Sequence, residues 1–171
     1  MKLIRLNNYE RLEGLNGEVI KSLYEFDRDL HYSYNNTEFS LEGWWNELIN
    51  RLRNNTIYII LLNKKNIMGY TAFLEDEKYK NFYVKNFTVN SRDRKNVAAF
   101  RILLREVLKA FIQSKYEVIR FSTHKSNKLM NSMCLKNGFI KTISGLNGDY
   151  NIYSMQKDKL RDIQIYKRLV R

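Results

Sequence analysis

The sequence predicts an α/β (α+β) fold in which helices flank a mixed, mostly antiparallel central sheet. Three observations support this prediction. In several segments apolar residues recur at the spacing of an amphipathic helix. Other segments are short, rich in β-branched and aromatic residues, and bounded by turn-forming residues, as strands are. In the second half of the chain a long helical segment separates two strand-like ones, which is the order that joins neighbouring parallel strands.

The size and composition of the chain fit one globular domain over residues 1–171. The hydrophobic fraction is 44% and the charged fraction 28%, which excludes disordered and collagen-like proteins. A chain of this length buries about 70% of the surface that its unfolded form exposes. The first residues turn polar too soon for a signal peptide, and no apolar run is long enough to span a membrane. We therefore expect a cytoplasmic protein that makes no membrane contact.

The N-terminal half predicts one strand, two helices and a hairpin. Helical spacing of apolar residues occurs twice, and a polar stretch connects the two helices. The β-branched and aromatic segments that follow enclose a turn. In order, these elements are Leu3–Leu6, a helix within 18–31, the connection His31–Thr37, a helix within 41–53, and the strands Ile57–Leu62 and Ile67–Leu74 around Asn63–Asn66.

The C-terminal half predicts strand, helix, strand, helix and a final pair of strands. Its clearest element is the helix at 98–112, where six apolar residues share one face. Ser126 is placed to cap the second helix and Gly138 to end it in a left-handed conformation. In order, these elements are Phe82–Val89, the helix at 98–112, Glu117–Thr123, the helix from Ser126 to Asn137, and the strands Phe139–Ser144 and Tyr150–Gln156.

Two stretches of the chain carry sequence signatures. In Phe87–Ala99, residues Arg94, Val97 and Ala99 fall on the positions of a Gln/Arg-x-x-Gly-x-Gly/Ala motif at a helix start. In Asn127–Phe139, the ends match an Asn-x(6)-Tyr-x-x-x-Gly-Phe motif, with Cys134 in place of the tyrosine. With the order of elements up to about residue 157, these stretches resemble the GNAT family of N-acetyltransferases.

The resemblance implies that acetyl-CoA binds at the first stretch. In the family, free backbone N–H groups and the positive end of a helix dipole bind the CoA pyrophosphate there. Val97 stands where the family has its first glycine and brings a β-branched side chain to the phosphates. Arg92, Arg94 and Lys95 can add charge-assisted bonds to phosphate, although such residues in a basic protein are often only solvated. The implied cofactor-binding residues are Phe87, Thr88, Val89, Arg92, Arg94, Lys95, Asn96, Val97, Ala98, Ala99 and Asn127.

The resemblance also implies the chemistry. A backbone N–H of the strand before the phosphate loop binds the thioester carbonyl oxygen while an amine attacks, a role that falls on Phe87–Val89. An acid then protonates the departing thiolate, and Cys134 is our candidate for this catalytic residue because it replaces the family's tyrosine. A packing role for Cys134 is the alternative, since cysteine is among the most often buried residues. For the general base, Glu75, Asp76 and Glu77 are candidates, and a solvated turn explains them as well.

The sequence thus predicts an acyl-CoA-dependent N-acetyltransferase that acts on a primary amine, borne by a small molecule, a protein or an RNA. Its acceptor pocket would form between the helices at 18–31 and 41–53 and the last hairpin. Tyr32, Tyr34, Trp44 and Trp45 are candidates to line this pocket. The two histidines, single cysteine and scattered carboxylates show no metal-ligand spacing, so no metal is expected.

The alternative is a catalytically inactive protein of the same fold that binds nucleic acid or an acidic partner. The net charge of +12, together with Val97 and Cys134, supports it. A coding bias toward Lys, Asn and Ile explains the charge equally well. The basic C-terminal extension at 157–171 docks on the domain, on a second subunit or on a polyanion, so a homodimer is among the states that the sequence allows.

Overall fold

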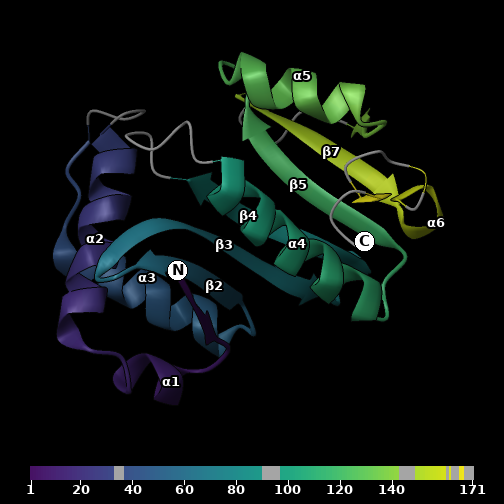
Figure 1. Ribbon diagram of the computed structural model, residues 1–171. Coiled ribbons are helices and arrows are strands. Elements are labelled where there is room, and N and C mark those ends of the chain that lie inside the picture. The colour runs from purple at the N-terminus through teal and green to yellow at the C-terminus, as the bar shows by residue number, and fades with distance from the viewer. Residues whose placement is uncertain (33–36, 90–96, 143–148, 161, 163–165, 168–171) are drawn as a thin grey trace. The chain divides into compact units, whose positions relative to one another are not determined.

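The computed structural model describes residues 1–32, 37–89, 97–142, 149–160, 162 and 166–167. In this part of the chain the strands form a seven-stranded sheet in the order β1-β2-β3-β4-β5-β7-β6 (Figure 1). The strands are β1 (Lys2–Leu6), β2 (Ile57–Asn63), β3 (Asn66–Asp76), β4 (Asn81–Val89), β5 (Val118–His124), β6 (Ile140–Thr142) and β7 (Tyr150–Gln156). The helices are α1 (Tyr9–Glu13), α2 (Gly17–Tyr32), α3 (Leu41–Arg53), α4 (Val97–Gln113), α5 (Lys128–Lys136) and α6 (Lys157–Leu160).

The predicted mixed sheet is confirmed. Strands β1 and β2, β5 and β7, and β6 and β7 pair antiparallel, whereas β4 and β5 pair in parallel. The parallel register runs from Phe82↔Ile119 to Val84↔Phe121, and β4 continues beyond it to Val89. Helix α4 connects these parallel neighbours, as its apolar spacing and position predicted.

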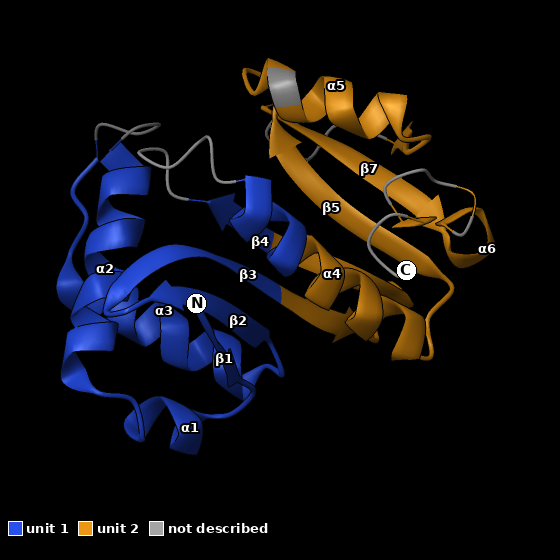
Figure 2. Ribbon diagram, in the orientation of Figure 1, with its two compact units in different colours: residues 1–72, 86–103 blue, residues 73–85, 104–171 orange. Residues whose placement is uncertain are grey.

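The chain divides into two compact units (Figure 2). Unit 1 comprises residues 1–72 and 86–103, and unit 2 comprises residues 73–85 and 104–171. Because the boundaries fall inside β3, β4 and α4, each of these elements contributes to both units.

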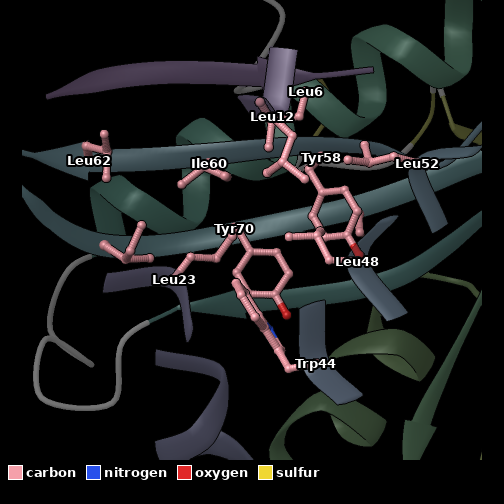
Figure 3. Close-up of a cluster of buried hydrophobic side chains, with 12 residues drawn as sticks. Leu6, Leu12, Leu23, Trp44, Leu48, Leu52, Tyr58, Ile60, Leu62 and Tyr70 are labelled. Carbon is pink, nitrogen blue, oxygen red and sulfur yellow. The ribbon is translucent and has the colours of Figure 1, made fainter. Parts of the chain in front are cut away.

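The core of unit 1 lies between the helices α1–α3 and strands β1–β3. Alternate residues of β2, namely Tyr58, Ile60 and Leu62, join a cluster with Trp44, Leu48 and Leu52 from α3 (Figure 3). The residues between them, Ile59 and Leu61, are buried as well. Burial on both faces explains why β2 reads as an unbroken apolar run rather than as an alternating pattern.

The core of unit 2 is built on aromatic rings. Phe82 of β4 stacks on Phe73 with ring centroids 4.9 Å apart and meets Phe111 of α4 at 5.5 Å. On β7, Tyr153 is 1% exposed and stacks on Phe121. The start of the C-terminal extension docks here, because Leu160 is 2% exposed and the Lys157 backbone N–H donates to the Glu117 carbonyl.

In β4 the alternation of side chains between the two faces of the sheet is interrupted once. Phe82 packs on Phe111 and Phe87 packs on Phe100, and both partners belong to α4. Residues an odd number of positions apart point to opposite faces of a regular strand, so one extra residue lies between Phe82 and Phe87, as in a β-bulge. Asn86 accordingly turns to α3, where its Oδ1 accepts a hydrogen bond from Arg51 Nη1 at 2.9 Å.

Several local predictions need correction. Asn127, not Ser126, caps α5, and its Oδ1 accepts from the Met130 N–H at 3.1 Å. Gly138 does adopt the left-handed conformation, with φ of 78°. The short helices α1 and α6 were not predicted, although Asn8 before α1 is a typical capping residue. Among the described helices, none combines the length and apolarity that crossing a membrane requires.

Candidate functional site

The end of β4 lies in unit 1 and is approached closely by the backbone of β3. A Cβ atom added to Gly69 would stand 2.5 Å from the Thr88 carbonyl oxygen and 3.0 Å from Val89 Cα. No real side chain tolerates the first of these distances, so only glycine permits this contact. The contact fixes Phe87–Val89, the segment predicted to hold the acyl group, against β3.

The N-terminus of α4, also in unit 1, presents an accessible first turn. Val97 is 53% exposed, so its side chain points to solvent, whereas Ala99 is fully buried. The first turn carries no acidic residue that would oppose an anion at the positive end of the helix. These features suit an anion at the start of the helix. The predicted partners Arg92, Arg94, Lys95 and Asn96 lie outside the described residues.

Asn127 and Cys134 lie in unit 2. The side-chain oxygen of Asn127 is engaged in capping α5. Cys134 is 3% exposed, and burial raises the pKa of its thiol to about 12. A thiol in this setting stays protonated and is shielded from solvent, which favours the packing role. Its assignment as proton donor stays a prediction.

The carboxylates considered as general bases serve the turn after β3. Asp76 Oδ1 accepts a hydrogen bond from the Tyr79 N–H at 3.1 Å. Glu77 forms an ion pair with Lys115, and its hydrogen bond to this lysine is the main reason that its pKa is lowered. Glu75 is exposed. A solvated turn accounts for all three.

A polar network in unit 1, not predicted from the sequence, is centred on Asp27 of α2. Asp27 Oδ2 accepts from Trp44 Nε1 at 2.8 Å, and Oδ1 accepts from the Tyr70 hydroxyl at 2.7 Å. Figure 3 shows the Tyr70 hydroxyl directed toward the indole of Trp44. Trp44 and Tyr70 are buried, but Asp27 is partly exposed. Asp27 therefore ties α2 to α3 and β3 and keeps access to solvent.

A second branch of the network runs through Arg51 of α3. Arg51 Nε donates to Glu47 Oε1 at 2.6 Å, and Arg51 Nη1 donates to Asn86 Oδ1. The Asn86 carbonyl in turn accepts from Thr71 Oγ1 at 2.9 Å. Asn86 directly precedes Phe87, so this branch connects α3 to the predicted acyl-binding segment.

Burial dominates the electrostatics of the network. It raises the pKa of Asp27, against the opposing effects of the hydrogen bonds from Trp44 and Tyr70 and of the Arg51 charge. Burial, followed by the charge of Asp27, raises the pKa of Tyr70 well above its usual range. Burial likewise raises the pKa of Tyr58, which the Arg51 guanidinium opposes. Both tyrosines therefore stay neutral at physiological pH.

The sequence does contain a signal for Asp27. Leu23, Asp27 and Leu30 share one face of α2 by helical spacing, so an acid stands where the periodicity calls for an apolar residue. Three of the four aromatic candidates, Tyr32, Trp44 and Trp45, lie in the described part of unit 1. Trp44 is buried and Trp45 partly buried, Tyr32 is 50% exposed, and Tyr34 lies outside the described residues. Among the described side chains, no group of three or more His, Cys, Asp and Glu is arranged to hold a metal ion.

Comparison by sequence finds no relative, since neither a family model nor a curated protein matches the chain. Comparison by structure finds acetyltransferases. An acetyltransferase from Streptococcus agalactiae 2603 shares a TM-score of 0.68 at 17% identity, over 90% of this chain and 98% of that one. A GNAT-family acetyltransferase from Staphylococcus aureus Mu50 has a TM-score of 0.66 at 15% identity, over 91% and 99% of the two chains.

A third similar structure has ligands bound. It is the spermidine N-acetyltransferase from Vibrio cholerae in complex with CoA and spermine, with a TM-score of 0.64 at 13% identity, over 92% of this chain and 96% of that one. These identities are low, and the likeness extends over nearly the whole length of each chain. The chain therefore has the fold of the GNAT acetyltransferases.

Proposed function

We propose that this chain transfers an acetyl group from acetyl-CoA to a primary amine. The observation that carries the proposal concerns the end of β4 and the start of α4, both in unit 1. There Gly69 fixes the Phe87–Val89 backbone, and α4 starts with an exposed turn free of acidic residues. A strand that offers backbone groups and a helix that offers its positive end suit the two ends of an acyl-CoA, the thioester and the pyrophosphate.

The reaction follows from that arrangement. The amine nitrogen attacks the thioester carbonyl carbon, and the resulting oxyanion accepts a hydrogen bond from a backbone N–H of Phe87–Val89. Collapse of this intermediate forms the amide C–N bond and breaks the C–S bond. CoA leaves as a thiolate, which gains a proton, while the amine nitrogen loses one to a base or to water.

The similar structures and the aromatic residues of unit 1 support the choice of acceptor. Two similar structures are spermidine N-acetyltransferases, which supports a small amine as the acceptor here. The aromatic residues of α2 and α3 in unit 1 supply faces that attract ammonium groups. We propose a small aliphatic amine rather than an amine on a protein or nucleic acid.

The thermal midpoint with and without acetyl-CoA tests the proposal. A ligand at about a hundred times its dissociation constant stabilises the folded state by about 2.7 kcal/mol. For a chain of this size the midpoint should rise by several degrees. Adenosine at the same concentration, which lacks the pyrophosphate and the thioester, is the control and should leave the midpoint unchanged. A positive result leads to an acetylation assay over a panel of aliphatic amines that includes spermidine.

A binding protein without catalysis is the second candidate, and the burial of Cys134 favours it. It would show no shift with millimolar acetyl-CoA. It would instead bind a polyanion column with a salt dependence that reports the number of phosphates contacted. Retention without a cofactor-induced shift would therefore replace the enzyme proposal.

A further inference from the structure

The carboxyl of Asp27 is costly for the stability of unit 1. Burial raises its pKa, which means that the folded environment disfavours the charged form. Polar groups in a protein interior are often replaceable by apolar packing of similar volume, as buried ion pairs are. We therefore expect an acid on the apolar face of α2 to have a role besides stability.

We propose that Asp27, framed by Trp44 and Tyr70, binds a non-reacting ammonium group of the acceptor, so that the acceptor is a diamine or polyamine. The identity of the bound molecule as an acceptor rests on the proposed function. The binding itself does not, and it can be tested without acetyl-CoA.

The hydrogen bonds of Asp27 leave it able to accept more. Each carboxylate oxygen has two lone-pair sites, and one site on each is used, by Trp44 Nε1 and by the Tyr70 hydroxyl. Both donors are neutral, so the negative charge stays available. Because Asp27 is partly exposed, a cation can reach it from solvent.

The surrounding charges favour a cation. Arg51 is the positive group whose charge acts on Asp27. Arg51 is itself paired with Glu47 at 2.6 Å and bonded to Asn86. Tyr58 and Tyr70 are neutral because their pKa values are raised. Arg28, which lies over the Tyr24 ring, is paired with Asp29 at 3.4 Å. With Asp27 ionised, the three carboxylates outweigh the two guanidinium groups, and the group carries net negative charge.

Aromatic rings add to the attraction. Tyr24 meets Trp44 edge-on with centroids 5.4 Å apart, and Phe26 meets Tyr70 at 5.9 Å. The Arg28 guanidinium already lies over the Tyr24 ring, 5.9 Å from its centroid. Rings of this kind bind ammonium groups through their faces and alkyl chains through their apolar surface.

The position of Asp27 separates it from the reacting strand. Asp27 is reached by the tip of the Tyr70 side chain, whereas the neighbouring residue Gly69 touches the backbone of Thr88 directly. The length of the Tyr70 side chain therefore separates an ammonium group at Asp27 from the backbone of the sheet. The amino group that attacks the acyl carbon must be a second one, which is why the acceptor needs two.

The two tryptophan indoles provide a direct readout of binding. Trp44 and Trp45 are the only tryptophans in the chain, so a ¹H–¹⁵N spectrum contains two indole signals, and Trp45→Phe assigns them. The Trp44 N–H donates to Asp27, so its signal should follow the ionisation of Asp27 as pH changes. The probe is 1,4-diaminobutane, and its neutral isostere 1,4-butanediol is the control.

We expect the diamine to move the Trp44 signal and to lower the pH midpoint of its titration, because a bound cation favours the carboxylate. The diol should do neither. Asp27→Asn should abolish the titration and weaken diamine binding at least about tenfold. Asp162→Asn makes the same chemical change at an exposed position outside this group and should leave binding unchanged. Tyr70→Phe removes one donor to the carboxylate, so it should raise the pH midpoint of the Trp44 titration.

Three results would overturn the inference: a Trp44 indole signal that does not change on addition of the diamine, an equal response to the diol, or undiminished diamine binding by Asp27→Asn. If Asp27→Asn does not fold, the pH titration of the unaltered chain with diamine and diol still decides. The outcome is separate from the proposed function. Diamine binding with no response to acetyl-CoA would reject only the acetyltransferase, and acetylation of amines with no role for Asp27 would reject only this site.

Discussion

At the scale of single residues, the packing of unit 1 depends on Gly69 and Asp27, whose partners the sequence does not reveal. Gly69 sits in the apolar strand β3 with nothing in the sequence to distinguish it from a residue that could carry a side chain. Its importance comes from the 2.5 Å separation between its missing Cβ and the Thr88 carbonyl oxygen. Asp27 was visible only as an acid on an apolar helix face, because its partners Trp44 and Tyr70 lie on other elements. Tertiary contacts of this kind leave no local pattern.

We expect Gly69→Ala to lower the free energy of unfolding by about 1–3 kcal/mol, since the new methyl group forces β3 and β4 apart. The movement falls on Thr88 and Val89, so stabilisation by acetyl-CoA should shrink as well. Chemical denaturation with and without acetyl-CoA measures both effects. Gly17→Ala, where a Cβ meets nothing within 4 Å, is the matched control. It should reduce neither the free energy of unfolding nor the stabilisation by acetyl-CoA.

At the scale of elements, periodicity was the reliable guide. Helix α4 was predicted almost to its ends because Leu103, Val107, Leu108 and Phe111 keep one face buried over its whole length. The bulge in β4 could not be predicted, because it depends on contacts with α4 and α3 rather than on the strand's own residues. The cap of α5 was misplaced by one residue since Ser126 and Asn127 are both good capping residues.

The start of α4 allows a prediction in which stability and binding change in opposite directions. Val97→Glu places a negative charge at the positive end of the helix, so the free protein should gain about 0.3–1 kcal/mol at low salt. The same charge should weaken acetyl-CoA binding about tenfold, which is about 1.4 kcal/mol, by repelling the pyrophosphate. Thermal melting at several acetyl-CoA concentrations measures both quantities. Val97→Gln has the same shape without the charge and should show neither effect; equal affinity of Val97→Glu and Val97→Gln would place the phosphates elsewhere.

At the scale of the whole molecule, the order and type of the main elements were read correctly, and the fold class followed from them. The candidate site was only partly accessible to sequence reasoning. Phe87–Val89 and Val97–Ala99 could be named as candidates because they belong to a motif that is continuous along the chain, and their role stays a prediction. The network of Asp27, Arg51 and Asn86 could not, since it assembles from α2, α3 and β4.

Each unit contains its own kind of intrinsic probe. Both tryptophans lie in unit 1, and the single cysteine, Cys134, is buried in unit 2. Since β3, β4 and α4 run through both units, we expect one cooperative transition. Tryptophan fluorescence and the reactivity of Cys134 toward a thiol reagent should give the same denaturant midpoint. Two separate midpoints would show that one unit persists without the other.

The interleaving of the units has a consequence for cutting the chain. Neither unit is a continuous stretch of sequence, so no single fragment reproduces one of them. The exposed turn at Lys78–Lys80 is a natural target for trypsin. A cut there would leave an N-terminal piece and a C-terminal piece that each carry parts of both units. The two pieces should co-elute as a nicked complex under native conditions, which makes the turn a place to split the protein into halves that reassemble.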